Sequence, residues 1–308
     1  MKKMTFVHAI CQPSDAVRGR LPVTAVLALA GTLAACGGSS SSSSDDRGPT
    51  DTTVSLPFEA VYNSSNDPVT CDGTLSGLGA GVDVQLEDFR LYLHDVRVTT
   101  SQQRELPLTL DDTLWQGSGV ALLDFRDFVS CGSVPQTPNT DVTGTVALNE
   151  GERIDGVQFK IGLPESLNHT NLVDAATPLN VPTMHWSWQS GYKFMRLDVT
   201  VAGGDDFKLH LGSTDCAGDP EAGDSVSCDR GNRPEVRFDT FTLGQDTIVI
   251  DYAAMVATAL DGVDDGGAPG CMSGVSDPEC AGVFAALGLD LASGTPDSQL
   301  NQVAFRLK

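Results

Sequence analysis

Alternation between apolar and polar residues is the dominant pattern of this chain from about residue 52 to its C-terminus. An apolar side chain at every second position is typical of a strand that buries one face. The stretches that alternate, or that form a short apolar run of strand length, are residues 52–62, 82–100, 119–125, 142–148, 153–164, 207–213, 235–252 and 301–308. The stretch 82–100 is longer than one ordinary strand, so we expect it to bend or to carry a β-bulge.

Helical patterns are scarce. Only YAAMVATAL at 252–260 and PECAGVFAALGL at 278–289 favour helices. Strands do not alternate with helices as a parallel α/β sheet requires, and no internal repeat is found. The sequence therefore predicts an all-β fold: an antiparallel β-sandwich with long loops and one or two short helices.

Residues 1–36 have the pattern of an export signal rather than of folded protein. Four basic residues precede the apolar run LPVTAVLALAGTLAAC, which is too short to span a bilayer. The ending Leu33-Ala34-Ala35-Cys36 resembles a bacterial lipobox, so we expect cleavage to leave Cys36 as a lipidated N-terminus that anchors the protein to a membrane. Gly37 follows the cysteine, and by analogy with other bacterial lipoproteins this favours the periplasmic side or the surface of the outer membrane.

The rest of the chain divides into a tether and one domain. Residues 37–51 are rich in Gly and Ser, which cannot bury enough surface to order a segment, so they predict a flexible tether. Residues 52–308 are long enough for one large β-sandwich domain.

Net charge excludes one class of partner. Residues 1–36 hold four basic residues and one acidic residue, so 15 basic and 40 acidic residues remain, a net charge of −25. Without a basic patch we expect no nucleic acid partner. Acidic loops such as DGVDDGG resemble calcium loops only loosely, because they lack the alternating ligand spacing and the closing Glu of an EF-hand.

Six cysteines remain after Cys36 in the exported chain, and an even number indicates disulfides. No CxxC spacing favours zinc or redox chemistry. Many pairings are open, but short loops favour Cys216–Cys228 and Cys271–Cys280, which leaves Cys71–Cys131.

Two tryptophans, Trp186 and Trp188, lie two residues apart in the segment MHWSWQSGYKF. If this segment is extended, both indoles share one face and His185 points to the other. Packing in a core is the commoner use of such a pair. His210 lies in a strand on the face opposite its apolar neighbours, and His169 lies in a loop after an apolar strand.

These segments together resemble the MbnP-like copper-binding proteins, also called the metallo-mystery-pair four-Cys family. The similarity rests on LNHTN, MHWSWQSGYKF, FKLHLGSTDC and GCMSGVSDPEC, which occur in this order over most of residues 52–308. The resemblance implies a non-enzymatic protein of copper homeostasis, which binds copper through histidines and a kynurenine. The kynurenine is made from tryptophan by a MauG/MbnH-like di-haem peroxidase.

Carried over residue by residue, the resemblance makes His169, His210, Trp186 and Trp188 the candidate copper site, and does not include His94 or His185. This chain has six cysteines in place of the family's four. Two alternatives remain open from the residues themselves. One is a carbohydrate- or small-ligand-binding surface lipoprotein that stacks its ligand on the two indoles, and the other is a structural surface lipoprotein with no small ligand.

Overall fold

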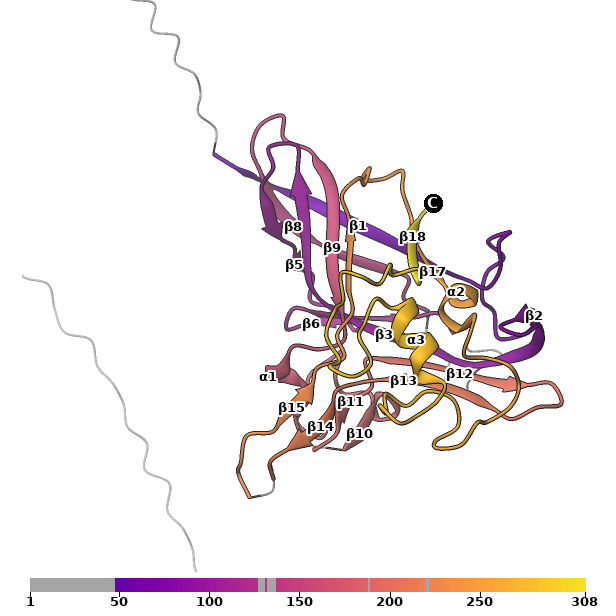
Figure 1. The fold of residues 1–308 in the computed structure, drawn as a ribbon. Coiled ribbons are helices and arrows are strands. Elements are labelled where there is room, and N and C mark those ends of the chain that lie inside the picture. The colour runs from indigo at the N-terminus through magenta and orange to yellow at the C-terminus, as the bar shows by residue number, and fades with distance from the viewer. Residues whose placement is uncertain (1–47, 127–130, 132–136, 188, 220–221) are drawn as a thin grey trace, which may run out of the picture. The chain divides into compact units, whose positions relative to one another are not determined.

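Strands are the main regular element in the computed structural model (Figure 1), which describes residues 48–126, 131, 137–187, 189–219 and 222–308. The expected signal peptide, its Cys36 and most of the tether lie outside these residues, as does Trp188. Among the described residues no helix is long and apolar enough to cross a membrane.

The smaller of the two main sheets has five strands in the order β18-β17-β1-β8-β5. Their bounds are β1 Thr50–Val61, β5 Thr109–Leu110, β8 Asp141–Leu148, β17 Ile248–Asp251 and β18 Phe305–Leu307. All neighbouring strands pair antiparallel except β1 and β17, which pair in parallel, with Phe58 opposite Ile248 and Val61 opposite Asp251. The last two strands of the chain, β17 and β18, therefore belong to the same sheet as the first strand, β1.

The larger sheet has nine strands and is built around one long strand, β3. The members are β2 Thr74–Leu78, β3 Val82–Thr100, β4 Glu105–Pro107, β6 Gln116–Gly117, β7 Val120–Asp124, β9 Ile154–Ile161, β12 Met195–Val201, β13 Phe207–Leu211 and β16 Glu235–Phe238. Strand β3 pairs with β2, β4, β7, β9 and β12, always antiparallel. One strand can serve so many partners because it spans 19 residues.

The bulge expected in residues 82–100 is present. The register of β3 against β9 shifts between His94 and Arg97. Asp95 lies inside this shift with a φ of 49°, a left-handed conformation that Asp tolerates better than most residues. The bulge lets one continuous strand change partners along its length.

Two hairpins and three short helices complete the fold. The hairpins are β10 His185–Ser187 with β11 Gly191–Tyr192, and β14 Thr214–Ala217 with β15 Ser227–Arg230. The helices are α1 Glu165–Asn168, α2 Tyr252–Val256 and α3 Cys280–Ala286, and a 3-10 turn spans Pro182–Met184. Helices α2 and α3 fall within the two predicted segments, whereas the single turn of α1 was not predicted because four residues are too few for a helical period.

The two main sheets meet through aromatic side chains. Phe159 of β9 packs edge-on against Phe58 of β1 and Phe305 of β18, with ring centroids 5.6 and 5.9 Å apart. All three rings are almost completely buried. Such edge-to-face pairs add about 0.5–1.5 kcal/mol each beyond their area burial. The all-β antiparallel sandwich predicted from the sequence is thus confirmed.

Three disulfides have the pairing favoured by short loops: Cys71–Cys131, Cys216–Cys228 and Cys271–Cys280. The third ties the loop after α2 to the start of α3. The backbone of Cys271 also forms an isolated β-bridge with Leu209 of β13, and Cys271 O accepts a hydrogen bond from His210 N at 2.9 Å. The disulfide loop therefore holds the outer edge of β13, where one of the candidate site residues lies.

Candidate metal site

His210 lies on β13 with its ring turned away from the apolar face, as its place in the alternating sequence predicted. Its neighbours Leu209 and Leu211 are fully buried, and His210 itself is only 6% exposed. The Nε2 atom lies 2.7 Å from Oδ1 of Asp198 on the adjacent strand β12. Because a carboxylate can only accept, Nε2 carries the proton and donates it. The other nitrogen, Nδ1, therefore has a bare lone pair, and it is buried with no hydrogen-bond partner among the described residues.

Asp198 belongs to a buried ion-pair network that crosses the larger sheet. The network joins three carboxylates to three guanidinium groups: Asp88, Asp124, Asp198, Arg90, Arg126 and Arg196. The register explains the cluster, since Arg196 pairs with Arg90 on one side and with His210 on the other. The formal charges of these six groups cancel, so the network leaves no unpaired charge of its own beside His210. Neutral imidazole is the form of histidine that binds metals.

The pKa of Asp198 reflects this setting. Burial alone would raise it, but the hydrogen bond and the electrostatic attraction of His210, followed by the charge and the hydrogen bond of Arg196, lower it below its ordinary value. Arg196 Nε lies 2.8 Å from Asp198 Oδ2, so each carboxylate oxygen has its own donor. The carboxylate is thus held ionised and orients the imidazole, the arrangement that commonly supports a metal-bound histidine.

Trp186 lies over His210. The two rings have centroids 6.4 Å apart and are tilted by 56°. The indole approaches the backbone closely at Gly212, where an added Cβ would come within 2.4 Å of Trp186 Cζ3. Because Gly212 has no side chain, it leaves room for the indole of Trp186 beside His210.

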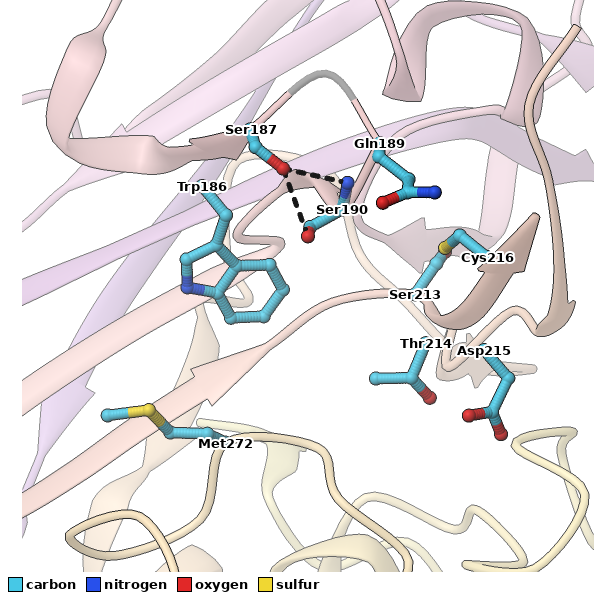
Figure 2. Close-up of a pocket in the computed structure, with 9 residues that line it drawn as sticks. All are labelled: Trp186, Ser187, Gln189, Ser190, Ser213, Thr214, Asp215, Cys216 and Met272. Carbon is cyan, nitrogen blue, oxygen red and sulfur yellow. Dashed lines mark hydrogen bonds between the residues drawn. The ribbon is translucent and has the colours of Figure 1, made fainter. Parts of the chain in front are cut away.

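The same indole borders an open pocket of about 460 Å³ (Figure 2). The pocket is lined by Trp186, Ser187, Gln189, Ser190, Ser213, Thr214, Asp215, Cys216 and Met272. Ser187 Oγ accepts from Ser190 N at 3.1 Å and contacts Ser190 Oγ at 3.0 Å, which ties the two ends of the β10–β11 turn together. One edge of Trp186 is therefore open to molecules that enter from solution.

His169 follows α1 as its C-cap and contacts a different set of groups. Its Nε2 lies 3.1 Å from Asn168 Nδ2, 3.3 Å from Cys228 Sγ and 3.9 Å from Glu165 Oε1. The preceding Asn168 is fully buried, and its Oδ1 accepts from Tyr192 N at 3.1 Å. This amide fixes the end of α1 against the β10–β11 hairpin, and so places His169 beside the hairpin that bears Trp186.

His185 turns away from the Trp186 side of its strand, as an extended segment requires. Its ring packs edge-on against Tyr192, with centroids 4.7 Å apart. Its Nε2 is buried with no hydrogen-bond partner among the described residues. Burial lowers the pKa of His185, and electrostatic interactions with His169 and Lys193 lower it further. His185 is thus within electrostatic reach of His169, although the resemblance did not include it in the site.

The structure brings two of the four predicted site residues, His210 and Trp186, into contact. His169 contacts the Cys216–Cys228 hairpin and residues of α1. Trp188 lies outside the described residues. His94 lies elsewhere: its Nδ1 donates to Gly162 O at 2.8 Å, and burial lowers its pKa to about 4. Sequence reasoning missed Asp198 and Asn168, because neither belongs to a motif and both act through contacts between distant segments.

Chemically, the cluster offers neutral imidazole nitrogens next to an indole. Two of those nitrogens, Nδ1 of His210 and Nε2 of His185, are desolvated without a compensating hydrogen bond, which is costly unless another group occupies the position. Imidazole suits copper, zinc, iron and nickel, and copper binds most tightly of the divalent first-row ions at such donors. The donors of His210 and His185 are therefore of a kind that copper takes, although His169, His185 and His210 do not place three ligand atoms within 4.8 Å of one another in the described part of the chain.

Two comparisons with known proteins show the family of this chain. A family model described as MbnP matches residues 51–273. Among solved structures, MbnP from Methylosinus trichosporium is similar to this chain with 30% identity and a TM-score of 0.75, over 84% of this chain and 98% of that one. No curated protein matches the sequence. Because the family model covers well over half of the chain and the solved structure aligns over nearly its whole length, this chain belongs to the MbnP family.

Proposed function

We propose that this protein binds copper beside the β10–β11 hairpin and takes part in copper homeostasis. The ligands are His210 through Nδ1, His169, and one tryptophan of the HWSW segment after its oxidation to kynurenine. A partner di-haem peroxidase carries out that oxidation, and the protein itself is not an enzyme. The MbnP family is associated with copper-related systems, which supports the choice of metal.

The observation that carries the proposal is the orphaned Nδ1 of His210. It is a buried acceptor with no hydrogen-bond partner among the described residues, its tautomer is set by Asp198, and its imidazole ring lies 6.4 Å from the ring of Trp186, centroid to centroid. Water or a cation can satisfy such an atom. A metal also accounts for Asp198, which orients the imidazole through Nε2, and for Trp186, which lies beside the ring and becomes a ligand after oxidation. His185 Nε2 is a further candidate ligand, because it too is buried and unpartnered.

An indole does not bind metals well as it stands, since its nitrogen is only a hydrogen-bond donor. Oxidation by two equivalents of peroxide inserts two oxygen atoms into the indole, releases two waters and gives N-formylkynurenine. Hydrolysis then removes the formyl group as formate. The net change is one oxygen gained and one carbon lost, and it leaves an aromatic amine and a ketone as new ligands. Trp186 lines an open pocket, so an oxidising partner has access to it.

We further propose that the lipidated Cys36 holds the domain at the periplasmic side or the surface of the outer membrane. Residues 37–51 would let it reach its peroxidase and its copper source. The alternative function, binding of a carbohydrate or another small ligand, has one observation in its favour: five of the nine residues that line the pocket beside Trp186 bear a hydroxyl or an amide group. Copper is preferred because a sugar site does not require an orphaned imidazole.

Co-production with the di-haem peroxidase tests the proposal. We expect intact mass spectrometry and peptide mapping to show the kynurenine mass change at Trp186 or Trp188, and copper titration to show one tight site that protein made alone lacks. His210→Ala should abolish that site, whereas His94→Ala, which removes an equally buried histidine elsewhere, should not. Tight copper binding with both indoles intact, or modification confined to Trp115, would contradict the proposal.

A further inference from the structure

The disulfide Cys216–Cys228 lies directly against His169. It joins facing residues of the β14–β15 hairpin, whose Cα atoms are 3.8 Å apart. Cys228 Sγ is 3.3 Å from His169 Nε2. Asn168 Nδ2, at 3.1 Å, can only donate to that same nitrogen, so Nε2 carries a lone pair rather than a proton. The lone pair of His169 is therefore held next to the disulfide sulfurs.

This trio is the only group of its kind in the described part of the chain. Among the described His, Cys, Asp and Glu side chains, only His169, Cys216 and Cys228 place three ligand atoms within 4.8 Å of one another. As a disulfide the two sulfurs are poor ligands, because metals bind the thiolate. As thiolates, together with one imidazole, they form a soft donor set that suits Cu(I).

The geometry points to a redox-gated Cu(I) site made of Cys216, Cys228 and His169, closed by the disulfide and opened by a dithiol reductant. Thiol–disulfide exchange opens it: the reductant's two thiols become a disulfide while Cys216 and Cys228 become thiols. Binding of Cu(I) then releases two protons and forms two copper–thiolate bonds and one copper–imidazole bond. Exchange with the disulfide of an oxidised dithiol partner reverses the step: Cys216 and Cys228 re-form their disulfide, the partner's disulfide takes up the two electrons and two protons to become two thiols, and the Cu(I) ion is released.

Accessibility favours this disulfide over the other two as the one that a reductant reaches. Cys271 and Cys280 are fully buried, and in Cys71–Cys131 only Cys131 is partly exposed, because Cys71 is 8% exposed. Cys216 and Cys228 are both partly exposed, and Cys216 forms part of the open pocket wall (Figure 2). Exchange requires in-line attack on a sulfur, so an exposed hairpin reacts before a buried core bond.

The hairpin keeps the ligands together after reduction. Backbone pairing of Thr214 with Arg230 and of Ala217 with Ser227 brackets the two cysteines. An ion pair of 2.9 Å between Arg230 Nε and Asp215 Oδ2 crosses the same hairpin. The thiols therefore stay opposite each other and next to His169, so little ordering is needed when the ion binds.

This site shares His169 with the proposed copper site but does not depend on it. It needs neither an oxidised tryptophan nor His210, and it operates only in the reduced protein. In a chain that has both sites, reduction would draw His169 toward the thiolates. The two proposals can therefore fail separately.

The test uses the folded domain under argon with dithiothreitol, which is then removed by gel filtration. Differential alkylation with peptide mapping should show Cys216 and Cys228 labelled before the other four cysteines. Titration with Cu(I) against a chromophoric Cu(I) chelator should show one more equivalent bound than in the oxidised protein. The gain should persist in His210→Ala, which removes a ligand of the other proposed site. It should be lost in the double variant Cys216→Ser/Cys228→Ser and in His169→Ala.

Alkylated wild-type protein provides a second test that avoids mutation, because iodoacetamide on the two exposed thiols should block the extra equivalent without altering the sequence. The proposal is overturned if reduction adds no Cu(I) equivalent, if the gain survives the double serine variant or His169→Ala, or if a buried disulfide opens first. It is also overturned if near-ultraviolet circular dichroism shows that opening Cys216–Cys228 unfolds the domain.

Discussion

Replacing Asp198 with Asn should move a proton on His210 without changing the shape of the side chain. In the wild type, Oδ1 of Asp198 accepts from His210 and Oδ2 accepts from Arg196. Asparagine has only one oxygen, and the guanidinium can only donate, so the amide oxygen must face Arg196. The amide NH₂ then points at His210 Nε2, which must become the acceptor. The proton moves to Nδ1, and the lone pair that we assign to copper is lost.

The size of the effect follows from the contacts. Loss of an outer partner of a metal-bound histidine typically weakens metal affinity by about 10–100-fold, which corresponds to about 1.4–2.8 kcal/mol. Stability should also fall, because Asp198 is 1% exposed and two charge-assisted hydrogen bonds become weaker neutral ones. At about 1 kcal/mol for each weakened bond, Asp198→Asn should lower the free energy of unfolding by about 2 kcal/mol.

Two measurements separate these effects. Long-range ¹⁵N–¹H correlation spectra report the tautomer of His210 in metal-free protein, and copper competition titrations report affinity in the peroxidase-treated protein. Glu152→Gln is the matched control, because the Glu152 side chain is equally buried and pairs with Arg104 at 2.6 Å. The control should lose stability but keep both the tautomer and the copper affinity. The reasoning is refuted if Asp198→Asn retains the Nε2–H tautomer, or if its copper affinity stays within about twofold of wild type.

Three further outcomes follow from the structure. Gly212→Ala should cost about 1–3 kcal/mol in denaturant melts and shift the indole fluorescence, because its Cβ would overlap Trp186; an unchanged spectrum would contradict the close approach. Asp277→Asn should change how stability depends on pH, because burial and Glu279 raise the pKa of Asp277 from 3.8 to about 6. A raised pKa means that the folded state binds the proton more tightly than the unfolded state does. Protonated Asp277 therefore stabilises the fold fully below pH 3.8, and this contribution is lost as pH rises through about 6. The difference in melting temperature between wild type and Asp277→Asn should therefore change across this pH range. A difference that stays constant with pH would contradict the raised pKa. Leu91→Ala, at a fully buried position on β3, should cost about 2–5 kcal/mol, and a smaller loss would show that β3 is not the centre of the core.

Local patterns of the sequence were sufficient for the longest strands and for the faces on which His210 and His185 lie, but they did not predict β2, β12, β14 or β15. Alternation placed His210 opposite Leu209 and Leu211, and placed His185 opposite Trp186, because a strand turns successive side chains to opposite faces whatever its partners are. The even number of cysteines and their short separations were likewise enough to predict three disulfides. The family was identified from four motifs that occur in a fixed order along the chain, a signal that is separate from the alternation of apolar and polar residues.

Strand order and register were decided only by the tertiary structure. Asp198 meets His210 because β12 and β13 pair antiparallel in one particular register, and a shift of one residue would turn both side chains to the other face. Periodicity within a strand carries no information about the partner strand. For the same reason the sequence did not show that β1 and β17 run parallel, or that His169 comes to rest on the Cys216–Cys228 hairpin. Such contacts depend on the free energy of the whole core, which selects one set of pairings among many that are locally equivalent.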